Sequence, residues 1–285
     1  MWNMTQWPSG GFAEWTEGNT AFLSVVFSWH LSDAYQRAVW YKSLGYRVRA
    51  GGPAVTMNSE ALVDVAELGG QVDAMPHHNL NATFTSRGCI RKCGFCAVPI
   101  IEGTLRELPD SEWTPKPIIC DNNLLACSDA HFDRVIDRLQ SANIKQIDFN
   151  QGLDARLLTE HHAARIAELD LFAVRLAFDS MRYEDEFLQA FDTLKRAGIP
   201  ARKIRVYVLF GFDDDPEDAR YRLEKVRSLG TQPNPMRFQP LDAVRRNEYI
   251  APKWTDYECR RYMRYWSRLR YFAQIPFSEF VVPQP

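Results

Sequence analysis

Apolar and polar residues alternate over the first 80 positions in a pattern that predicts short strands separated by helices. Residues 22–27 (FLSVVF) form an apolar run rich in β-branched and aromatic side chains, which is typical of a buried strand. A helical pattern follows over residues 32–44, and residues 46–56 predict a second strand. A further helix is expected over residues 59–68, with Ser59 as its N-cap. Residues 1–80 are therefore expected to form a small α/β layer.

From residue 82 onward the pattern becomes a regular alternation of strands and helices. Strand-like runs are expected at residues 82–86, 117–120, 144–149, 173–178, 204–210 and 235–239. Helical patterns fill most of the gaps, at residues 129–140, 159–169, 183–197 and 216–229. The stretch from Cys96 to Pro117 contains four prolines and is expected to be a loop or a shortened helix. Strands joined by helices form parallel sheets, so residues 81–244 predict an α/β fold, a partial (β/α)6 TIM-like barrel.

Composition and charge narrow the class of protein. The chain has 285 residues, 46% of them hydrophobic and 25% charged, and its formal net charge is -2. These values exclude an intrinsically disordered chain and a wholly cationic nucleic-acid-binding protein. The start of the chain shows no basic segment followed by an apolar one, and the apolar stretch at residues 21–29 is too short to span a bilayer. We therefore expect a cytoplasmic protein with no membrane contact, in which cysteines stay reduced.

Three of the six cysteines are crowded into one short segment. Cys89, Cys93 and Cys96 have the spacing C-x3-C-x2-C, and Gly88 and Gly94 allow the backbone to wrap so that three thiolates converge. A cluster of four irons normally takes four thiolates, so three ligands would leave one iron open. The alternatives are a zinc site, with a fourth ligand from another cysteine or a distant histidine, and three incidental cysteines.

Two basic residues lie inside the same loop. Arg91 and Lys92 are expected to favour the thiolate forms and to offset the charge of a cluster. The other three cysteines, Cys120, Cys127 and Cys259, lack a compact ligand spacing and are expected in the core.

At the cysteine loop the sequence resembles the radical S-adenosylmethionine (SAM) superfamily, whose hallmark is C-x3-C-x2-C after the first strand of a partial β/α barrel. Phe95 occupies the position at which that superfamily usually has an aromatic residue packed near the adenine of SAM. Residues 96–103 (CAVPIIEG) resemble the segment after the cluster loop in the cobalamin-associated and methylthiotransferase-like branches. The resemblance covers roughly residues 82–241. It implies a 4Fe-4S cluster on Cys89, Cys93 and Cys96, SAM as cosubstrate, and an external electron donor of the flavodoxin or ferredoxin type. In that superfamily, SAM is cleaved reductively to a 5'-deoxyadenosyl radical.

The resemblance also implies SAM contacts at the ends of the later strands. The residues in these positions are Asp121, Asn122 and Asn123 for the amino group, Gln151, Asp154 and Arg156 for the carboxylate, Asp179 and Ser180 for the ribose, and Gly211 beside the adenine. The segment DNN stands in place of the better-known GGE, and a helix-capping turn is its alternative interpretation. For Gln151, Asp154 and Arg156, a solvated loop is the alternative interpretation. The acidic residues 213–215 precede Pro216 and are expected to favour the N-terminus of the next helix.

The N-terminal layer resembles half of the Rossmann-like domain that binds cobalamin in the cobalamin-associated branch. About 80 residues are too few for the whole domain, and the motif D-x-H-x-x-G is absent because His30 lies in SWHLSD. Cobalamin is therefore not expected, and the layer is interpreted as a truncated relic. His77 and His78 are expected to be surface or linker residues.

Residues 245–285 are expected to form a basic and aromatic helical extension. Residues 245–272 carry eight Arg or Lys against three acidic residues. On a helix beginning at Asp256, one face would carry Arg260, Arg261, Arg264 and Arg268. This face predicts binding to nucleic acid or another polyanion, and solvated arginines are the alternative.

These patterns together predict a radical SAM enzyme that abstracts hydrogen from, or transfers a group to, a substrate that the sequence does not identify. One alternative is a methyl- or methylthio-transferase that acts on nucleic acid or protein. The other is a non-catalytic zinc or iron-sulfur protein that binds nucleic acid. Metal analysis and absorbance distinguish the zinc form of the last from the first two, because iron with sulfide is brown and zinc is colourless.

Overall fold

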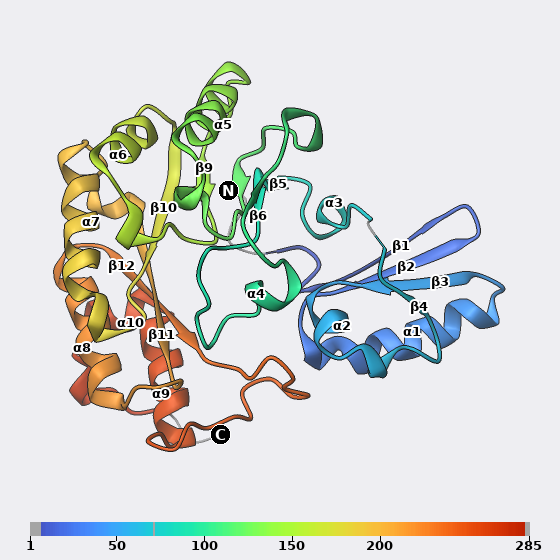
Figure 1. Cartoon of the computed structure of the whole chain (residues 1–285). Coiled ribbons are helices and arrows are strands. Elements are labelled where there is room, and N and C mark those ends of the chain that lie inside the picture. The colour runs from blue at the N-terminus through green and yellow to red at the C-terminus, as the bar shows by residue number, and fades with distance from the viewer. Residues whose placement is uncertain (1–6, 71, 283–285) are drawn as a thin grey trace. The chain divides into compact units, whose positions relative to one another are not determined.

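The computed structural model describes residues 7–70 and 72–282 (Figure 1), so the first six residues of the expected N-terminal layer lie outside the described part. The chain divides into two compact units. The first consists of Met1–Ala82, Cys96–Gly103 and Gln239–Tyr249. The second consists of Thr83–Phe95, Thr104–Phe238 and Ile250–Pro285.

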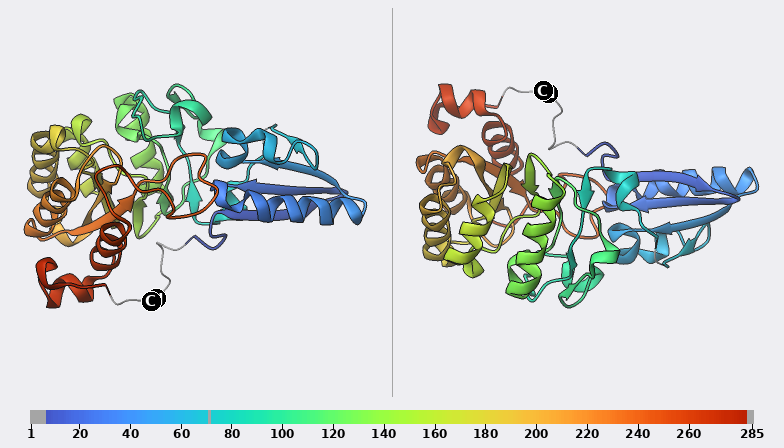
Figure 2. Two further views of the ribbon diagram at one scale, coloured as in Figure 1. Left: turned by 90° about the horizontal axis from the view of Figure 1, so that it is seen from below. Right: turned by 90° about the horizontal axis from the view of Figure 1, so that it is seen from above.

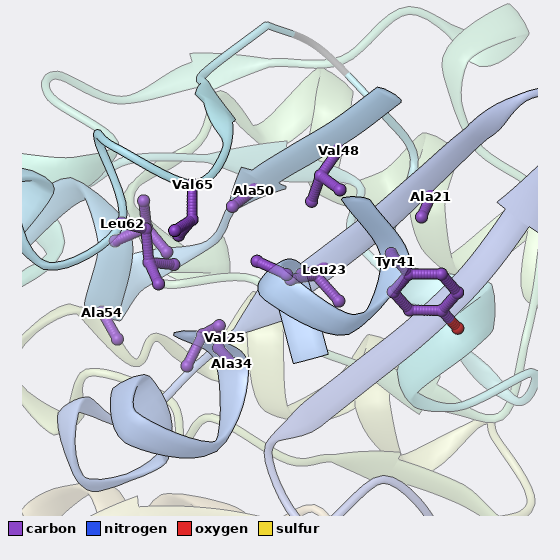
Figure 3. Close-up of a cluster of buried hydrophobic side chains, with 12 residues drawn as sticks. Ala21, Leu23, Val25, Ala34, Tyr41, Val48, Ala50, Ala54, Leu62 and Val65 are labelled. Carbon is purple, nitrogen blue, oxygen red and sulfur yellow. The ribbon is translucent and has the colours of Figure 1, made fainter. Parts of the chain in front are cut away.

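The first unit contains a four-stranded sheet of order β1-β2-β3-β4. Its strands are β1 Phe12–Glu17, β2 Thr20–Val25, β3 Arg47–Gly51 and β4 Glu67–Leu68. Its helices are α1 Leu31–Ser43, α2 Pro53–Met57, α3 Met75–His78 and α4 Val98–Ile101. β1 pairs antiparallel with β2, whereas β2, β3 and β4 are parallel. Figure 3 shows the core of this unit, where Leu23, Val48 and Leu62 are buried together.

The β-α-β pattern expected over residues 22–56 is confirmed in its first two elements and only partly in its third. β3 ends at Gly51, because Gly52 adopts φ +99° and Pro53 then begins α2. The helix expected over residues 59–68 is wrong. Only Ser59–Ala61 is helical, as a 3-10 turn, and the chain then extends so that Glu67 pairs with Arg49 of β3. Strand pairing and burial of Leu62 override the local helical pattern.

The second unit is built on a six-stranded sheet of order β12-β11-β10-β9-β8-β5. Its strands are β5 Ala82–Thr83, β8 Ile118–Ile119, β9 Ile147–Phe149, β10 Leu171–Ala177, β11 Ile204–Phe210 and β12 Gln232–Arg237. The pairings from β8 to β12 are parallel. The expected α/β class with a parallel sheet is therefore confirmed, and the six strands follow one another across the sheet in chain order.

Four helices alternate with these strands, as expected. They are α5 Asp129–Ser141, α6 Glu160–Ala167, α7 Glu184–Arg196 and α8 Pro216–Ser228. Three of the four starts have a side-chain cap: Ser128 accepts from the His131 N–H, Thr159 and His162 form a capping box, and Asp215 accepts from the Asp218 N–H. The two views in Figure 2 show these helices along the same side of the sheet.

The two faces of the sheet differ in chemistry. On β11, Ile204, Val206, Val208 and Phe210 are fully buried, whereas Arg205, Tyr207 and Leu209 alternate with them and are partly exposed. α8 packs on β11 through buried Ala219, Leu223 and Val226. The helices therefore cover the apolar face, and the opposite face carries polar side chains.

That polar face includes a buried ion pair. Arg175 on β10 donates from Nε and Nη2 to the two carboxylate oxygens of Asp148 on β9, at 2.7 and 2.6 Å. Asp148 is 0% exposed and Arg175 is 4% exposed. Arg205 is the Cα partner of Arg175 on the neighbouring strand.

Shorter elements complete the chain. β6 Ser86–Arg87 pairs antiparallel with β7 Arg106–Glu107, and α9 Asp256–Trp266 and α10 Leu269–Gln274 form the C-terminal part. The 3-10 turns are η1 Ser28–His30, η2 Ser59–Ala61, η3 Asp110–Glu112, η4 Leu124–Ala126, η5 Ala155–Leu157, η6 Met181–Tyr183, η7 Ala201–Lys203 and η8 Phe277–Glu279. The short helix α4 confirms the expectation for the proline-rich stretch. Among the described residues, every helix is too short or too polar to cross a bilayer.

Candidate functional site

The carboxyl ends of the parallel strands carry most of the residues expected to form a site. Three of them lie in one hydrogen-bonded group within the second unit: Cys89, Asn123 and Asp154. The Asn123 side-chain amide donates to Cys89 Sγ at 3.5 Å and to Asp154 Oδ2 at 3.3 Å. The structure therefore connects the cysteine loop with the loops after β8 and β9.

The backbone and the side chain of Arg91 both make hydrogen bonds that hold the cysteine loop. Its backbone N–H donates to Cys89 Sγ at 3.3 Å, and its Nε donates to Asp154 Oδ2 at 3.1 Å. The Gly88 N–H donates to Asn122 Oδ1 at 3.1 Å, so a second residue of the DNN segment also holds this loop. Gly88 adopts φ +77°, a conformation that favours glycine. The Arg91 guanidinium is thus paired with Asp154, and its expected effect on the thiolates stays a prediction.

Asp121, the first residue of DNN, is buried and turned toward the β5–β6 connection. Its carboxylate accepts from the Thr85 N–H at 2.6 Å and from the Thr85 hydroxyl. Burial raises the pKa of Asp121, and the Thr85 hydrogen bonds offset part of this rise. Both of its oxygens therefore already have a partner within the protein.

Asn123 differs from Asp121 in one respect that matters for ligand binding. Its side chain is buried, and its amide donates to Cys89 and Asp154, but its Oδ1 accepts no hydrogen bond from the described residues. A buried acceptor without a donor is costly unless a ligand or water completes it. Asn123 thus presents an unused acceptor next to the Cys89 sulfur.

Asp154 is the centre of a charged group. It accepts from Arg156 Nε at 2.6 Å and from Arg156 Nη2 at 3.1 Å, in addition to Arg91 and Asn123. Burial alone would raise the pKa of Asp154, but hydrogen bonds and charge from the two arginines outweigh it and lower the pKa. The Arg156 guanidinium also lies 4.6 Å from the ring centroid of Tyr183. Arg156 is therefore oriented by two partners.

Cys93 experiences opposing influences from the same surroundings. Burial raises the pKa of its thiol, the positive charge of Arg156 lowers it, and the negative charges of Cys89, Asp154 and Asp179 raise it further. The pKa is raised overall, so a metal that binds Cys93 must displace a proton.

Aromatic side chains gather at the ends of β11 and β12. The Phe95 ring contacts the Phe212 ring edge-on at a centroid distance of 5.7 Å, and Phe212 lies 4.8 Å from Phe238. A Cβ on Gly94 would approach the Phe212 ring to 3.3 Å, so this position favours a residue without a side chain. Phe95 thus contacts the residue that follows Gly211, the other position expected beside the adenine.

The loop after β11 is stabilised by a buried arginine. Arg222 of α8 donates to the carbonyls of Phe178 and Leu209 at 3.1 and 2.6 Å and to the Asp214 carboxylate. Asp214 also accepts from the Gly211 N–H at 2.7 Å, and Gly211 adopts φ +76°. Asp215 caps α8, which confirms one of the three acidic residues expected there. The role of Asp214 was not foreseen.

The remaining expected contacts have separate partners. Asp179 Oδ1 accepts from the Leu209 N–H at 2.8 Å, and burial raises its pKa. Ser180 Oγ accepts from the Arg182 N–H at 3.3 Å and caps η6. Gln151 is exposed.

All six cysteines are free thiols, and the three of the motif are partly exposed. Cys120, Cys127 and Cys259 are buried, as expected, and burial raises the pKa of both Cys120 and Cys127 to about 12. Across residues 7–70 and 72–282, no three His, Cys, Asp or Glu side chains are grouped so that they could hold a metal ion. Cys89 and Cys93 belong to the second unit, and Cys96 begins the segment Cys96–Gly103 of the first.

Free thiols with N–H donors directed at one sulfur are nevertheless the donor type that an iron-sulfur cluster takes. The thiols of Cys89, Cys93 and Cys96 are donors of this type.

No protein-family model matches this chain, and a search of curated proteins finds no match. The functional interpretation therefore depends on the residues and their geometry.

The first unit contains a small cavity at the carboxyl ends of β2, β3 and β4. It measures about 70 Å³ and is lined by Trp15, Phe22, Arg49 and two pairs of glycines, at 51–52 and 69–70. Pockets for drug-sized ligands are usually about 300 Å³ or larger. This cavity has room for a group of only a few atoms.

The expectation for His78 is wrong. His78 is 6% exposed and bridges Ser9 Oγ at 2.7 Å and Ser24 Oγ at 2.9 Å, because α3 packs on β1 within the first unit. His77 instead stacks on the Trp15 ring with a centroid distance of 3.8 Å.

The four arginines expected on one face of the C-terminal helix have different surroundings. Arg260 pairs with Asp256 at 2.8 Å. Arg261 donates to the backbone carbonyls of Phe277 and Phe280, so it holds the C-terminal segment. Arg264 and Arg268 lie near Tyr271.

Proposed function

We propose that this chain is a radical SAM enzyme with a partial β/α barrel and a 4Fe-4S cluster held by Cys89, Cys93 and Cys96. The observation that carries the proposal is the C-x3-C-x2-C loop after the first strand of the parallel sheet, with Asn123 donating to Cys89 Sγ. Two residues separate Cys93 from Cys96, so the chain itself keeps their Cα atoms within about 11 Å. When bound, the cluster would supply the electron that cleaves SAM to methionine and a 5'-deoxyadenosyl radical.

The residues of the chain would bind and orient SAM. Asn123 Oδ1, the buried acceptor without a donor, is suited to the SAM ammonium group. Asp121 is not suited, because Thr85 occupies its carboxylate. Within the DNN segment, the amino-group contact is therefore assigned to Asn123.

The other SAM contacts follow the same logic. Phe95 and Phe212 offer aromatic surface to the adenine and exclude water from it. Asp179 uses Oδ1 for Leu209, which leaves Oδ2 for a ribose hydroxyl. Arg156 is held by Asp154 and Tyr183, and we assign the SAM carboxylate to it or to exposed Gln151. The electron would come from an external flavodoxin- or ferredoxin-type protein. We propose a cytoplasmic location, because six free cysteines suit a reducing compartment.

The decisive experiment is anaerobic reconstitution with iron and sulfide, followed by addition of SAM and reductant. Wild-type protein should hold about four irons per chain and release 5'-deoxyadenosine. Cys93→Ala should abolish both, whereas Cys127→Ala, a matched change at a buried cysteine outside the motif, should retain the iron. Zinc in place of iron, or a normal yield from Cys93→Ala, would refute the proposal.

A second test addresses Asn123. Asn123→Leu removes the acceptor and the N–H groups donated to Cys89 and Asp154, whereas Asn122→Ala removes the bond to the Gly88 N–H. We expect Asn123→Leu to raise the SAM concentration needed for half-maximal 5'-deoxyadenosine formation about tenfold or more, since loss of a hydrogen bond to a charged group costs about 1.5–3 kcal/mol. An unchanged SAM dependence would reassign the amino-group contact.

A further inference from the structure

Three arginine side chains gather around the phenol of Tyr271 in the C-terminal part of the second unit. Arg270 Nη2 donates to Tyr271 Oη at 3.1 Å, and the Arg270 guanidinium lies 4.9 Å from the ring centroid. The Arg268 guanidinium lies 5.8 Å from the same centroid. Hydrogen bonding from Arg270, Arg264 and Arg268 lowers the pKa of Tyr271 to about 8. Arg270 is thus hydrogen-bonded to the phenol oxygen, and Arg268 and Arg264 lie close enough to act on it.

These three arginines lack a carboxylate partner. Residues 259–278 contain no Asp or Glu. In the described part of the chain, no carboxylate oxygen lies within 4.0 Å of Arg264, Arg268 or Arg270, in contrast to Arg260, which pairs with Asp256. Like charges that converge without a counter-charge repel each other, so a bound anion would relieve this repulsion.

The arrangement favours phosphate over other anions. Guanidinium groups present N–H donors in a planar fork that matches phosphate oxygens, and here three such groups lie around one phenol. The Tyr271 ring is partly exposed, and Leu269 beside it is 64% exposed. Aromatic and apolar surface beside converging arginines is the combination on which single-stranded nucleic acids stack their bases.

We propose that Arg264, Arg268, Arg270 and Tyr271 form a binding site for the phosphate backbone of a single-stranded nucleic acid. The site differs from the helix face expected from the sequence, because Arg260 and Arg261 have partners within the protein and Arg270 of α10 takes part instead. With three phosphate contacts, the logarithm of the association constant should fall with the logarithm of salt concentration with a slope of about -2. This site is independent of the cluster, since none of its residues belongs to the candidate SAM site.

The test measures binding of the full chain to fluorescent 20-nucleotide single-stranded RNA and DNA, at several salt concentrations. The double variant Arg268→Glu/Arg270→Glu should weaken binding at least about tenfold and flatten the salt slope. Arg202→Glu, which changes the net charge at an exposed arginine far along the chain from this site, should have little effect. Thermal unfolding of each variant shows that the fold is retained.

Two further variants separate the contributions of ring and charge. Tyr271→Phe keeps the stacking surface and should retain binding, whereas Tyr271→Ala should lose about tenfold or more, the contribution of one stacked base. Arg268→Lys/Arg270→Lys should keep most of the salt slope with weaker affinity. The proposal is overturned if nucleic acid binds with the same affinity to the Glu variant, if only inorganic phosphate binds, or if only an acidic electron-donor protein binds and depends on these arginines.

Discussion

Removing the carboxylate of Asp148 should destabilise the second unit more than removing its arginine partner. Asp148 and Arg175 are both buried and joined by two hydrogen bonds of 2.7 and 2.6 Å. Breaking a buried pair by removing one member typically costs about 3–5 kcal/mol, because the other charge stays buried without compensation. Asp148→Leu leaves the Arg175 guanidinium buried without its carboxylate partner.

The neighbouring strand makes the two single variants unequal. Arg205 is the Cα partner of Arg175, and adjacent strands are about 4.8 Å apart. In Asp148→Leu, two guanidinium groups lose the one carboxylate they share, so we expect the upper end of the range, about 4–5 kcal/mol. In Arg175→Met, Asp148 keeps the favourable charge of Arg205, which already acts on it. The cost there should be smaller by about 1–2 kcal/mol.

The double variant Asp148→Leu/Arg175→Met completes the cycle. It buries no unpaired charge apart from the existing Arg205, so it should recover most of the loss. Urea unfolding followed by circular dichroism measures the free energies of unfolding, and a loss of 4 kcal/mol should lower the urea midpoint by about 1–2 M. Hydrogen exchange of β9 and β10 peptides assigns the change to this unit. Equal losses in the two single variants, or a double variant as unstable as Asp148→Leu, would refute this account of the charges.

Three further predictions concern a cap, a turn and a titrating group. Thr255→Ala removes the side chain that accepts from the Glu258 N–H at the start of α9, and urea unfolding should show a loss of about 1 kcal/mol. Gly211→Ala places a Cβ on a residue at φ +76°, with no described atom beyond its chain neighbours within 4 Å of it, and the backbone strain should cost about 1–2 kcal/mol by the same measurement. Burial, and then the charge of His77, lower the pKa of His78, so below pH 6.5 the unfolded chain binds a proton that the folded chain does not. Stability should therefore fall on acidification through pH 6.5, with a smaller fall in His78→Asn, and equal slopes for the two proteins would contradict the burial effect.

Side-chain alternation predicted the regular parts of the fold. β11 spans the expected residues 204–210, because its buried residues alternate without interruption. β12 begins three residues before the expected start. Pro233 and Pro235 argue against a strand in the sequence, but prolines are accepted in a strand at the edge of a sheet, where β12 lies. β1 was missed altogether, since FAEWTE places charged residues between its apolar ones. Pairing partners, which a single segment does not encode, decide such cases.

The sequence predicted which residues form the candidate site, but not how each of their side chains is used. The sequence placed Asn123, Asp154 and the cysteine loop at adjacent strand ends, and the hydrogen bonds among them agree with that expectation. Which member of DNN carries an unused acceptor depends on the Thr85 contacts of Asp121, which involve a residue 36 positions away. The buried pair of Asp148 and Arg175 was also missed. A charged residue inside a strand is visible in the sequence, but its partner is known only once the strands are aligned.

The prolines of β12 have a consequence for how molecules of this protein meet one another. The Phe238 N–H donates to the Phe210 carbonyl, so residues 234 and 236, which share its direction along the strand, also face β11. Pro233 and Pro235 therefore occupy the outward positions, where a strand normally presents free N–H groups. An edge without these donors cannot pair fully with a strand from another molecule, and this protects a six-stranded parallel sheet against edge-to-edge aggregation.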